Sequence, residues 1–259
     1  MRERVLVVIP VYGHHDMTHR LLGDLDRERL LVDVVVVDNL GDYPRRGSEL
    51  IVRPETNLGW AGGTNAGTAA HRQAEHVGFL WLNNDTRLSP GFTAGLVQSW
   101  KETGAGVLGP VYDCHWAHQR APRVTAADRY RPRRRHYRAP FLDGTAMFVP
   151  ATTVGRIGLL DADTFAPLGW GAEIDYCLQA RAVGREVVVT ELAYLNHKRS
   201  VTAQTMFAGG YNEYFGRAYP VAMAGLSAKW GDWQARSGVD PATSQTAPLS
   251  RGARLRSRR

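Results

Sequence analysis

Cysteine is scarce in this sequence, because Cys114 and Cys177 are the only two among 259 residues and lie far apart. Their spacing does not match a zinc site, and they cannot form the disulfide framework of a small secreted domain. This usage favours a reducing compartment, and we expect a cytoplasmic protein.

Long apolar runs are also missing from the sequence. No stretch approaches the roughly 20 apolar residues that a membrane-spanning helix needs. The first residues, MRERVLVVIPVYG, contain a short apolar run without a small-residue cleavage pattern, so they predict a strand and not a signal peptide. We expect a soluble protein that at most associates with the inner face of a membrane.

Common nucleotide-binding and nucleophile motifs are absent. The segment 57–67, NLGWAGGTNAG, has four glycines, whose backbone amides could approach a ligand closely. It has neither the Gly-Lys-Ser/Thr of a Walker loop nor the spacing of the dinucleotide fingerprint. No Ser-His-Asp or reactive-cysteine arrangement is evident, which argues against covalent catalysis.

Positive charge is unevenly distributed over a chain of net charge +7. Residues 129–138 carry six arginines, and residues 250–259 carry five more. The internal block is either a solvated loop or a surface for an anionic substrate such as a phosphate-bearing acceptor. Tyr130 and Tyr137 could stack on bases, but no nucleic-acid-binding module surrounds them, so no nucleic acid partner is expected.

Alternating strand and helix patterns predict an α/β fold with a mostly parallel central sheet flanked by helices. The predicted strands are 5–12, 32–39, a short one in the fifties, 77–85, 106–113, 141–150 and 185–197. The predicted helices are 17–30, 63–74 and 170–184, followed by a C-terminal helical segment at 206–238 that Pro220 must break or start. Gly144 marks a point of close backbone approach within the strand 141–150.

Polar residues follow the predicted strands. Tyr12, Asp38 and Asp85 each lie at or just past a strand end, where open α/β sheets bind ligands. Asp85 closes the run FLWLNND, and a carboxylate there suits a hard divalent cation completed by substrate phosphates. Turn chemistry alone could also explain Asn83, Asn84 and Asp85.

Two further segments could carry chemistry. Glu173 and Asp175 lie two residues apart in the first turn of a predicted helix, so they project in different directions and cannot do the same job. His197 follows a strand, and its imidazole beside Asp85 would suit Mn²⁺ better than Mg²⁺. A structural role for the histidine remains the alternative.

In order, seven segments resemble the family 2 glycosyltransferases of the GT-A fold, most closely the bacterial rhamnosyltransferase-like branch. They are VVIPVYG (7–13), VVVVDNLGD (34–42), NLGWAGGTNAG (57–67), FLWLNNDTRLSPG (79–91), FLDGTAMFVP (141–150), GAEIDYCLQARAVG (171–184) and LNHKRS (195–200). The resemblance implies one GT-A domain over 1–238, with a nucleotide-binding half (1–113), an acceptor and catalytic half (114–205) and the helical segment 206–238. Residues 239–259 are expected to form a basic, disordered tail.

The resemblance also implies roles for single residues. Nucleotide-sugar contacts fall on Pro10, Tyr12, Asp38, Asn57, Gly62, Gly63, Asn65, Asn83 and Asn84. Asp85 occupies the last position of the family's Asp-x-Asp motif and His197 the position of a further metal ligand, with Mn²⁺ or Mg²⁺ as cofactor. Glu173 replaces the aspartate that usually acts as base, and Asp175 is the second choice for that role.

The expected activity is therefore inverting transfer of a sugar from a UDP- or dTDP-linked donor to a glycan, lipid-linked or protein acceptor, within bacterial or phage glycan biosynthesis. Two other interpretations remain open. A sugar-nucleotide nucleotidyltransferase would need basic residues after the first strand, where this chain has Gly13-His14-His15-Asp16. A non-catalytic module could instead use the arginine block to hold a polyanion.

Overall fold

The computed structural model of the chain describes residues 3–114, 116–199 and 201–237. The strands are β1 (Arg4–Val11), β2 (Leu31–Asp38), β3 (Leu50–Val52), β4 (His76–Leu82), β5 (Thr86–Leu88), β6 (Val107–Tyr112), β7 (His136–Arg138), β8 (Ala146–Pro150) and β9 (Val187–His197). The helices are α1 (His15–Leu25), α2 (Gly59–His71), α3 (Phe92–Thr103), α4 (Ala151–Ile157), α5 (Ala172–Ala182), α6 (Val201–Met206), α7 (Gly210–Trp230) and α8 (Trp233–Ser237), with a 3₁₀ turn η1 (Ala127–Arg129). The predicted tail 239–259 lies outside the described residues.

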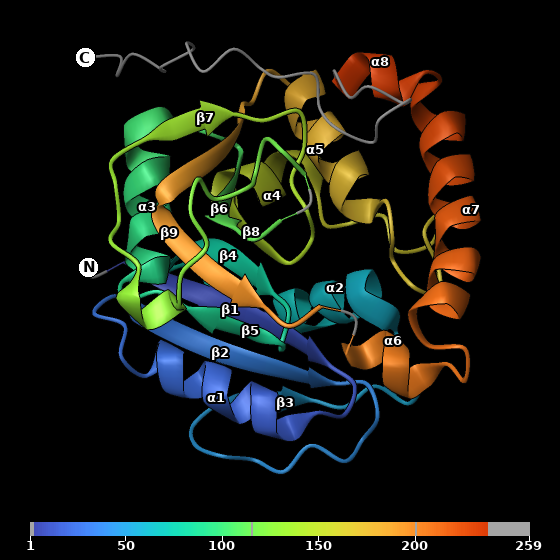
Figure 1. Cartoon of the computed structure of the whole chain (residues 1–259), viewed down its shortest axis with the longest axis horizontal. Helices are drawn as coiled ribbons and strands as arrows, with labels where there is room; N and C mark the ends of the chain where they lie inside the picture. The colour runs from blue at the N-terminus through green and yellow to red at the C-terminus, as the bar shows by residue number, and fades with distance from the viewer. Residues whose placement is uncertain (1–2, 115, 200, 238–259) are drawn as a thin grey trace.

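The strands form a single sheet in the order β3-β2-β1-β4-β8-β6-β9-β5, with β7 also paired to β9 (Figure 1). The neighbours β3, β2, β1 and β4 are parallel, and β9 is parallel to β6. Because β8 is antiparallel to both β4 and β6, β6 and β9 run in the direction of β4. The sheet is therefore mostly parallel, as predicted, and six strands end at one edge.

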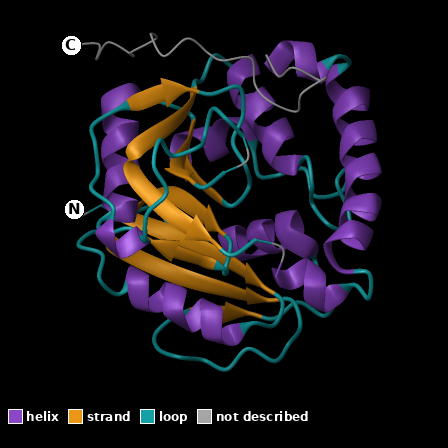
Figure 2. Ribbon diagram, viewed as in Figure 1, coloured by secondary structure: helices purple, strands orange, loops and turns teal. Residues whose placement is uncertain are grey.

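Helices cover both faces of this sheet (Figure 2). Along β1, the buried Val5, Val7 and Ile9 pack on the face covered by α1 and α3. The alternate residues Leu6 and Val8 pack on the other face, against α2, α4 and α5. Because neither face of β1 meets water, its sequence is a continuous apolar run instead of an alternating one.

Two irregularities of β9 shape its C-terminal end. The pairing of β9 with β6 shifts register so that Pro110 lies opposite Thr190 while the next residue, Val111, lies opposite Tyr194. Three residues of β9, 191–193, therefore bulge out of this ladder. Beyond the bulge β9 pairs with β5, and His197 lies opposite Thr86.

Three sequence expectations need correction. The strand predicted over 141–150 begins only at Ala146, and α3 at 92–103 was not predicted. Pro220 neither breaks nor starts a helix, because α7 runs through it from Gly210 to Trp230. Pro220 has no N–H group, so the carbonyl of Gly216 lacks its usual helical donor. Both residues are exposed, and water can donate to that carbonyl instead.

Among the helices of the described ranges, none is both long and apolar enough to traverse a bilayer.

A glycine is required where α2 begins. Gly59 has φ +66°, and a Cβ there would overlap the carbonyl oxygen of Pro167. We expect Gly59→Ala to lower the free energy of unfolding by about 2–4 kcal/mol, since backbone strain and overpacking add. Gly104 has the same φ with nothing within 4 Å of its virtual Cβ, so Gly104→Ala reports strain alone, about 1–2 kcal/mol. Equal losses for the two variants in urea denaturation would contradict the packing argument.

Candidate active site

A cavity of about 670 Å³ opens at the edge where the parallel strands end. Its lining includes residues that directly follow β1, β2 and β4, namely Tyr12, Asn39 and Asn83. Tyr112 and His197, the last residues of β6 and β9, line it as well. The direction of the strands thus gathers segments that lie far apart in the sequence around one hollow.

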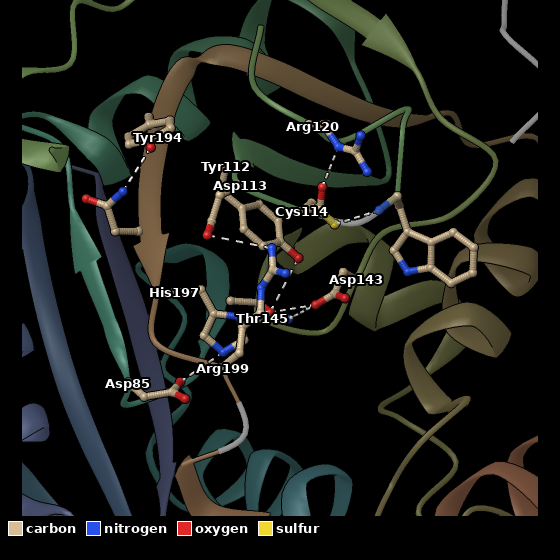
Figure 3. A network of polar contacts seen from close by, with 12 residues as sticks. Asp85, Tyr112, Asp113, Cys114, Arg120, Asp143, Thr145, Tyr194, His197 and Arg199 are labelled. Carbon is tan, nitrogen blue, oxygen red and sulfur yellow. Dashed lines mark hydrogen bonds and ion pairs between the residues drawn. The ribbon is translucent and has the colours of Figure 1, made fainter. Parts of the chain in front are cut away.

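Asp85 and His197 face each other in this cavity. The antiparallel pairing of β5 with β9 begins with Thr86 opposite His197, and the Lys198 N–H donates to the Asp85 carbonyl at 2.9 Å. As a result, the Nε2 atom of His197 lies 3.1 Å from the Oδ1 atom of Asp85 (Figure 3). The two side chains are only 14% and 9% exposed, so water screens this pair weakly.

A chain of polar contacts continues from His197 into the cavity (Figure 3). The Thr145 hydroxyl donates to Oδ1 of Asp143 at 2.5 Å and lies 3.3 Å from Nδ1 of His197. Because that hydroxyl donates to Asp143, it can accept a hydrogen bond from Nδ1–H of His197. The protonated imidazole can therefore donate from Nδ1 to Thr145 and from Nε2 to Asp85 at the same time.

The charges around His197 affect its protonation. Burial alone would lower the pKa of His197, but the hydrogen bond to Asp85 and the negative charges of Asp85 and Asp143 raise it above its usual value. The imidazole is thus held as a partner of the Asp85 carboxylate.

Glu173 lies on another wall of the same cavity, in the first turn of α5. The Gly171 N–H donates to its Oε2 atom at 3.0 Å. Gly144 lies close by, since a Cβ added there would be 3.1 Å from the Trp60 ring and 3.5 Å from Cβ of Glu173. The close approach predicted at Gly144 is therefore confirmed.

The carboxyl group of Glu173 is unusually basic. Burial, reinforced by the negative charge of Asp143, raises its pKa to about 8 despite the hydrogen bond from Gly171. Glu173 still retains partial exposure toward the cavity. A carboxylate with these properties can accept a proton from a bound hydroxyl group near neutral pH.

Asp175 is directed elsewhere. It is 0% exposed and does not line the cavity. Its carboxylate accepts hydrogen bonds from Lys229 Nζ at 2.8 Å, Trp230 Nε1 at 2.7 Å and Gln179 Nε2 at 2.6 Å. Asp175 therefore joins α5 to the end of α7, and the two acids of α5 do have different surroundings.

The residues expected to contact a nucleotide-sugar fall into two groups. Those that line the cavity are Pro10, Tyr12, Asn57, Asn83 and Asn84, and those that do not are Asp38, Gly62, Gly63 and Asn65. Asn84 also donates from Nδ2 to the Thr18 hydroxyl at 3.1 Å, which ties the end of β4 to α1.

Asp38 is fully buried and bonded within its own region. Its carboxylate accepts from the backbone N–H groups of Gly41 at 2.8 Å and Tyr43 at 2.9 Å, and from Arg53 Nε at 3.1 Å. In this structure Asp38 organises the loop after β2, and the neighbouring Asn39 is the residue that reaches the cavity.

The glycines of α2 mainly allow helix packing. A Cβ at Gly63 would lie 3.2–3.3 Å from atoms of Asn39 and Pro10, and one at Gly67 would lie 2.6 Å from Val8. Asn65 exchanges two hydrogen bonds with the Leu160 backbone, at 2.8 and 3.1 Å. The segment thus positions α2 against the sheet, and its Asn57 end borders the cavity.

The arginine block does not reach the cavity. None of the arginines within 129–138 is among its lining residues. Two of them form ion pairs with residues of α3 and of the segment before β9, Arg134 with Glu102 at 2.9 Å and Arg138 with Glu186 at 3.2 Å. The structure therefore places the arginine block outside the cavity, around β7, and both interpretations of the block stay open.

Sequence reasoning missed several residues of the cavity. Asp143 and Thr145 lie in the segment FLDGT, which was assigned to a strand. The other wall is formed by aromatic side chains of α7, and the aromatic richness of this region was visible in the sequence. The sequence did not predict that these aromatic side chains share one face of a helix, because Pro220 was expected to interrupt that helix.

Replacing Asp175 tests its structural role. We expect Asp175→Ala to lower the free energy of unfolding by about 3 kcal/mol, because the partly buried Lys229 and Trp230 donors lose their fully buried acceptor. Asp161, which also pairs with Lys229 but is 26% exposed, provides the control, and Asp161→Ala should cost clearly less. Urea denaturation gives both values. Normal stability of Asp175→Ala would contradict this role.

Known proteins were compared with the chain by sequence and by structure. No protein-family model matches the chain. Its fold is similar to that in the crystal structure of GalNAc-T7 with UDP, GalNAc and Mn²⁺, with a TM-score of 0.59 and 13% identity. The match covers 75% of this chain and 43% of that chain. The protein therefore has a GT-A glycosyltransferase-like fold.

Sequence relatives occur in mycobacteria. The uncharacterized proteins Rv1525 of Mycobacterium tuberculosis H37Rv and Mb1552 of Mycobacterium bovis are each 38% identical to the chain over 235 residues. Each match covers 91% of this chain and 88% of the relative. Because identity of this level extends over nearly the whole length, the chain belongs to the same family as these mycobacterial proteins.

Proposed function

We propose that this protein is an inverting glycosyltransferase that moves a sugar from a UDP- or dTDP-linked donor to an acceptor hydroxyl group. One observation carries the proposal. The cavity at the strand ends is lined both by Asp85 with its partner His197 and by the basic carboxylate Glu173. The GT-A glycosyltransferase-like fold supports the same activity.

In this proposal the half 1–113 holds the nucleotide. Pro10, Tyr12 and Asn57 line the part of the cavity next to β1 and α2, where a nucleoside would lie at the carboxyl edge of the sheet. The diphosphate would extend toward Asp85. Arg199 also lines the cavity, and its guanidinium group can pair with phosphate oxygens.

Asp85 and His197 fit a divalent metal ion. The Asp85 carboxylate and the His197 imidazole, which lie 3.1 Å apart in the cavity, are the residues that would hold such an ion. Within the described residues no group of three or more His, Cys, Asp or Glu side chains could hold a metal. Substrate phosphates would therefore complete the shell. When bound, Mn²⁺ or Mg²⁺ offsets the charge of the leaving diphosphate.

Glu173 is the proposed general base. Its carboxylate takes the proton of the acceptor hydroxyl while that oxygen forms a bond to the anomeric carbon. The bond from this carbon to the diphosphate oxygen breaks on the opposite face, so the anomeric configuration inverts. Burial, with a smaller contribution from the negative charge of Asp143, raises the pKa of Glu173, and the acid form of Glu173 is the state that follows transfer.

A donor panel tests the proposed activity. Thermal denaturation is measured with UDP, dTDP, GDP and CDP, each with and without Mn²⁺. A ligand at 100 times its Kd stabilises by about 2.7 kcal/mol, and we expect stabilisation by UDP or dTDP that increases with Mn²⁺. Lack of stabilisation by every nucleotide would contradict the proposal.

Replacement of the base should separate chemistry from donor binding. We expect Glu173→Gln to lower kcat at least 100-fold, since general base catalysis typically contributes 10²–10⁴-fold. Stabilisation by UDP and Mn²⁺ should be unchanged. The control is Glu186→Gln, an exposed acid outside the cavity, which should retain wild-type turnover. Normal turnover of Glu173→Gln would exclude Glu173 as base.

The raised pKa of Glu173 predicts opposite pH trends for activity and stability. Only the deprotonated base is active, so kcat should rise with pH up to about 8. The folded protein binds a proton that the unfolded chain has lost between the usual value of 4.5 and about 8. Stability contributed by Glu173 is therefore lost as the pH rises across this window, by at most about 1.4 kcal/mol per pH unit. Glu173→Gln should remove both trends, as measured by kinetics and urea denaturation at several pH values.

Thr145 tests the geometry of the proposed metal site. We expect Thr145→Val to weaken Mn²⁺ binding about 10–100-fold, because His197 loses the group that fixes its ring. Thr145→Ser keeps the hydroxyl and should bind nearly as well as the wild type. Electron paramagnetic resonance of free Mn²⁺ in the presence of UDP measures the affinity. Equal affinity of the Val and Ser variants would contradict this role.

A further inference from the structure

A row of large aromatic side chains along α7 is exposed. Tyr211, Phe215 and Tyr219 recur every four residues, so they lie on one face of the helix. Their exposed fractions are 43%, 40% and 44%, which is high for side chains of this size. All three line the same cavity as Glu173 and Asp85. We call these three residues the aromatic row.

The rings of the aromatic row are ordered relative to one another. Phe215 and Tyr219 lie nearly parallel, with ring centroids 5.0 Å apart and an interplanar angle of 19°. Tyr211 follows at 6.0 Å from Phe215, and Trp170 meets Phe215 edge-on at 5.6 Å. Eight residues of helix extend about 12 Å, so the row offers several platforms in succession.

The aromatic row is held in a defined position relative to Glu173. Helix α5 carries Glu173, which faces the cavity. The same helix is joined to α7 by Asp175, which binds Lys229 and Trp230 at the end of α7. Tyr214 of α7 also lines the cavity, and its ring packs edge-on against Trp170 at 5.5 Å. A molecule resting on the row is thus presented from a fixed wall of the cavity that holds the base.

We propose that the aromatic row is the acceptor subsite, and that its ligand is a carbohydrate of at least two sugar residues whose rings pack on Tyr211, Phe215 and Tyr219. This inference rests on the proposed glycosyl transfer and names the class of its acceptor. The terminal sugar would extend from the row toward Glu173.

The chemistry of the row favours a sugar over a lipid chain. One face of a pyranose ring carries mainly C–H groups, which pack on aromatic rings, while its hydroxyl groups need polar partners. Two of the three rings carry phenol hydroxyls, and the cavity also presents Arg199, Thr202 and Gln234. A prenyl chain would leave these polar groups without partners, at a cost for each one buried.

The test measures sugar binding directly on the full chain. Saturation-transfer NMR is recorded with a set of disaccharides that end in rhamnose, galactose, glucose or N-acetylglucosamine, in the presence of UDP and Mn²⁺. The double variant Phe215→Leu/Tyr219→Leu keeps apolar side chains but removes the rings, whereas Phe215→Tyr/Tyr219→Phe keeps the rings. We expect binding of at least one disaccharide by the wild type, at least tenfold weaker binding by the Leu variant, and wild-type affinity in the ring-preserving variant.

The controls separate this inference from the proposed function. Arg217→Ala lies on α7 but outside this cavity, and it should bind the disaccharide as the wild type does. Stabilisation by UDP and Mn²⁺ shows that the donor site and the fold are intact in each variant. If the wild type is not stabilised by UDP and Mn²⁺ but binds a disaccharide, the proposed glycosyl transfer is refuted and the sugar subsite is not. Equal affinity of the Leu variant and the wild type would overturn the inference. So would binding of vesicles that contain a prenyl phosphate when no disaccharide binds.

Discussion

The pairing of β5 with β9 is the constraint on which the chemistry of this cavity depends. Asp85 ends the turn after β4, and His197 ends β9, more than a hundred residues later in the sequence. Only the antiparallel ladder that sets Thr86 opposite His197 brings their side chains together. Backbone hydrogen bonds hold the chain beside both side chains. Little conformational entropy is therefore lost when a ligand binds Asp85 and His197. The remaining walls are arranged around this fixed pair.

Helix α5 shows how one short segment can supply both chemistry and architecture. Asp175 accepts hydrogen bonds from two donors of α7 and from Gln179 of α5 itself, and such partners are the usual condition for a buried carboxylate. Among the described residues Glu173 accepts a hydrogen bond from the Gly171 N–H and pairs with no cation, and burial raises its pKa. A buried carboxylate with few hydrogen-bond donors lowers the stability of the folded state. This is a common feature of catalytic groups.

The sequence predicted the sheet well and the cavity only in part. The strands β1 and β4 and the second half of β2 are apolar runs buried on both faces, so the pattern determines both their existence and where they end. Tyr12 and Asp85 could be placed at the edge for this reason. Asp38 could not, because a strand end gives no information on whether the carboxylate turns toward a ligand or toward its own loop. The predicted helix break at Pro220 was wrong for a different reason. A proline is tolerated where water can bond the carbonyl it leaves free, and local propensity does not show that Gly216 is exposed to solvent.

The bulge at 191–193 has a consequence for how this family can change its length. Side chains alternate faces along a strand, so an odd number of extra residues exchanges the faces of everything that follows. The three residues that β9 adds after Thr190 therefore set the side on which His197 emerges. A deletion of one residue within the bulge would turn the imidazole toward the face covered by α2, α4 and α5, because His197 now shares the face of Leu195, whereas a deletion of two would preserve its direction. Length variants that retain the histidine in the cavity are thus restricted to changes by even numbers at this position.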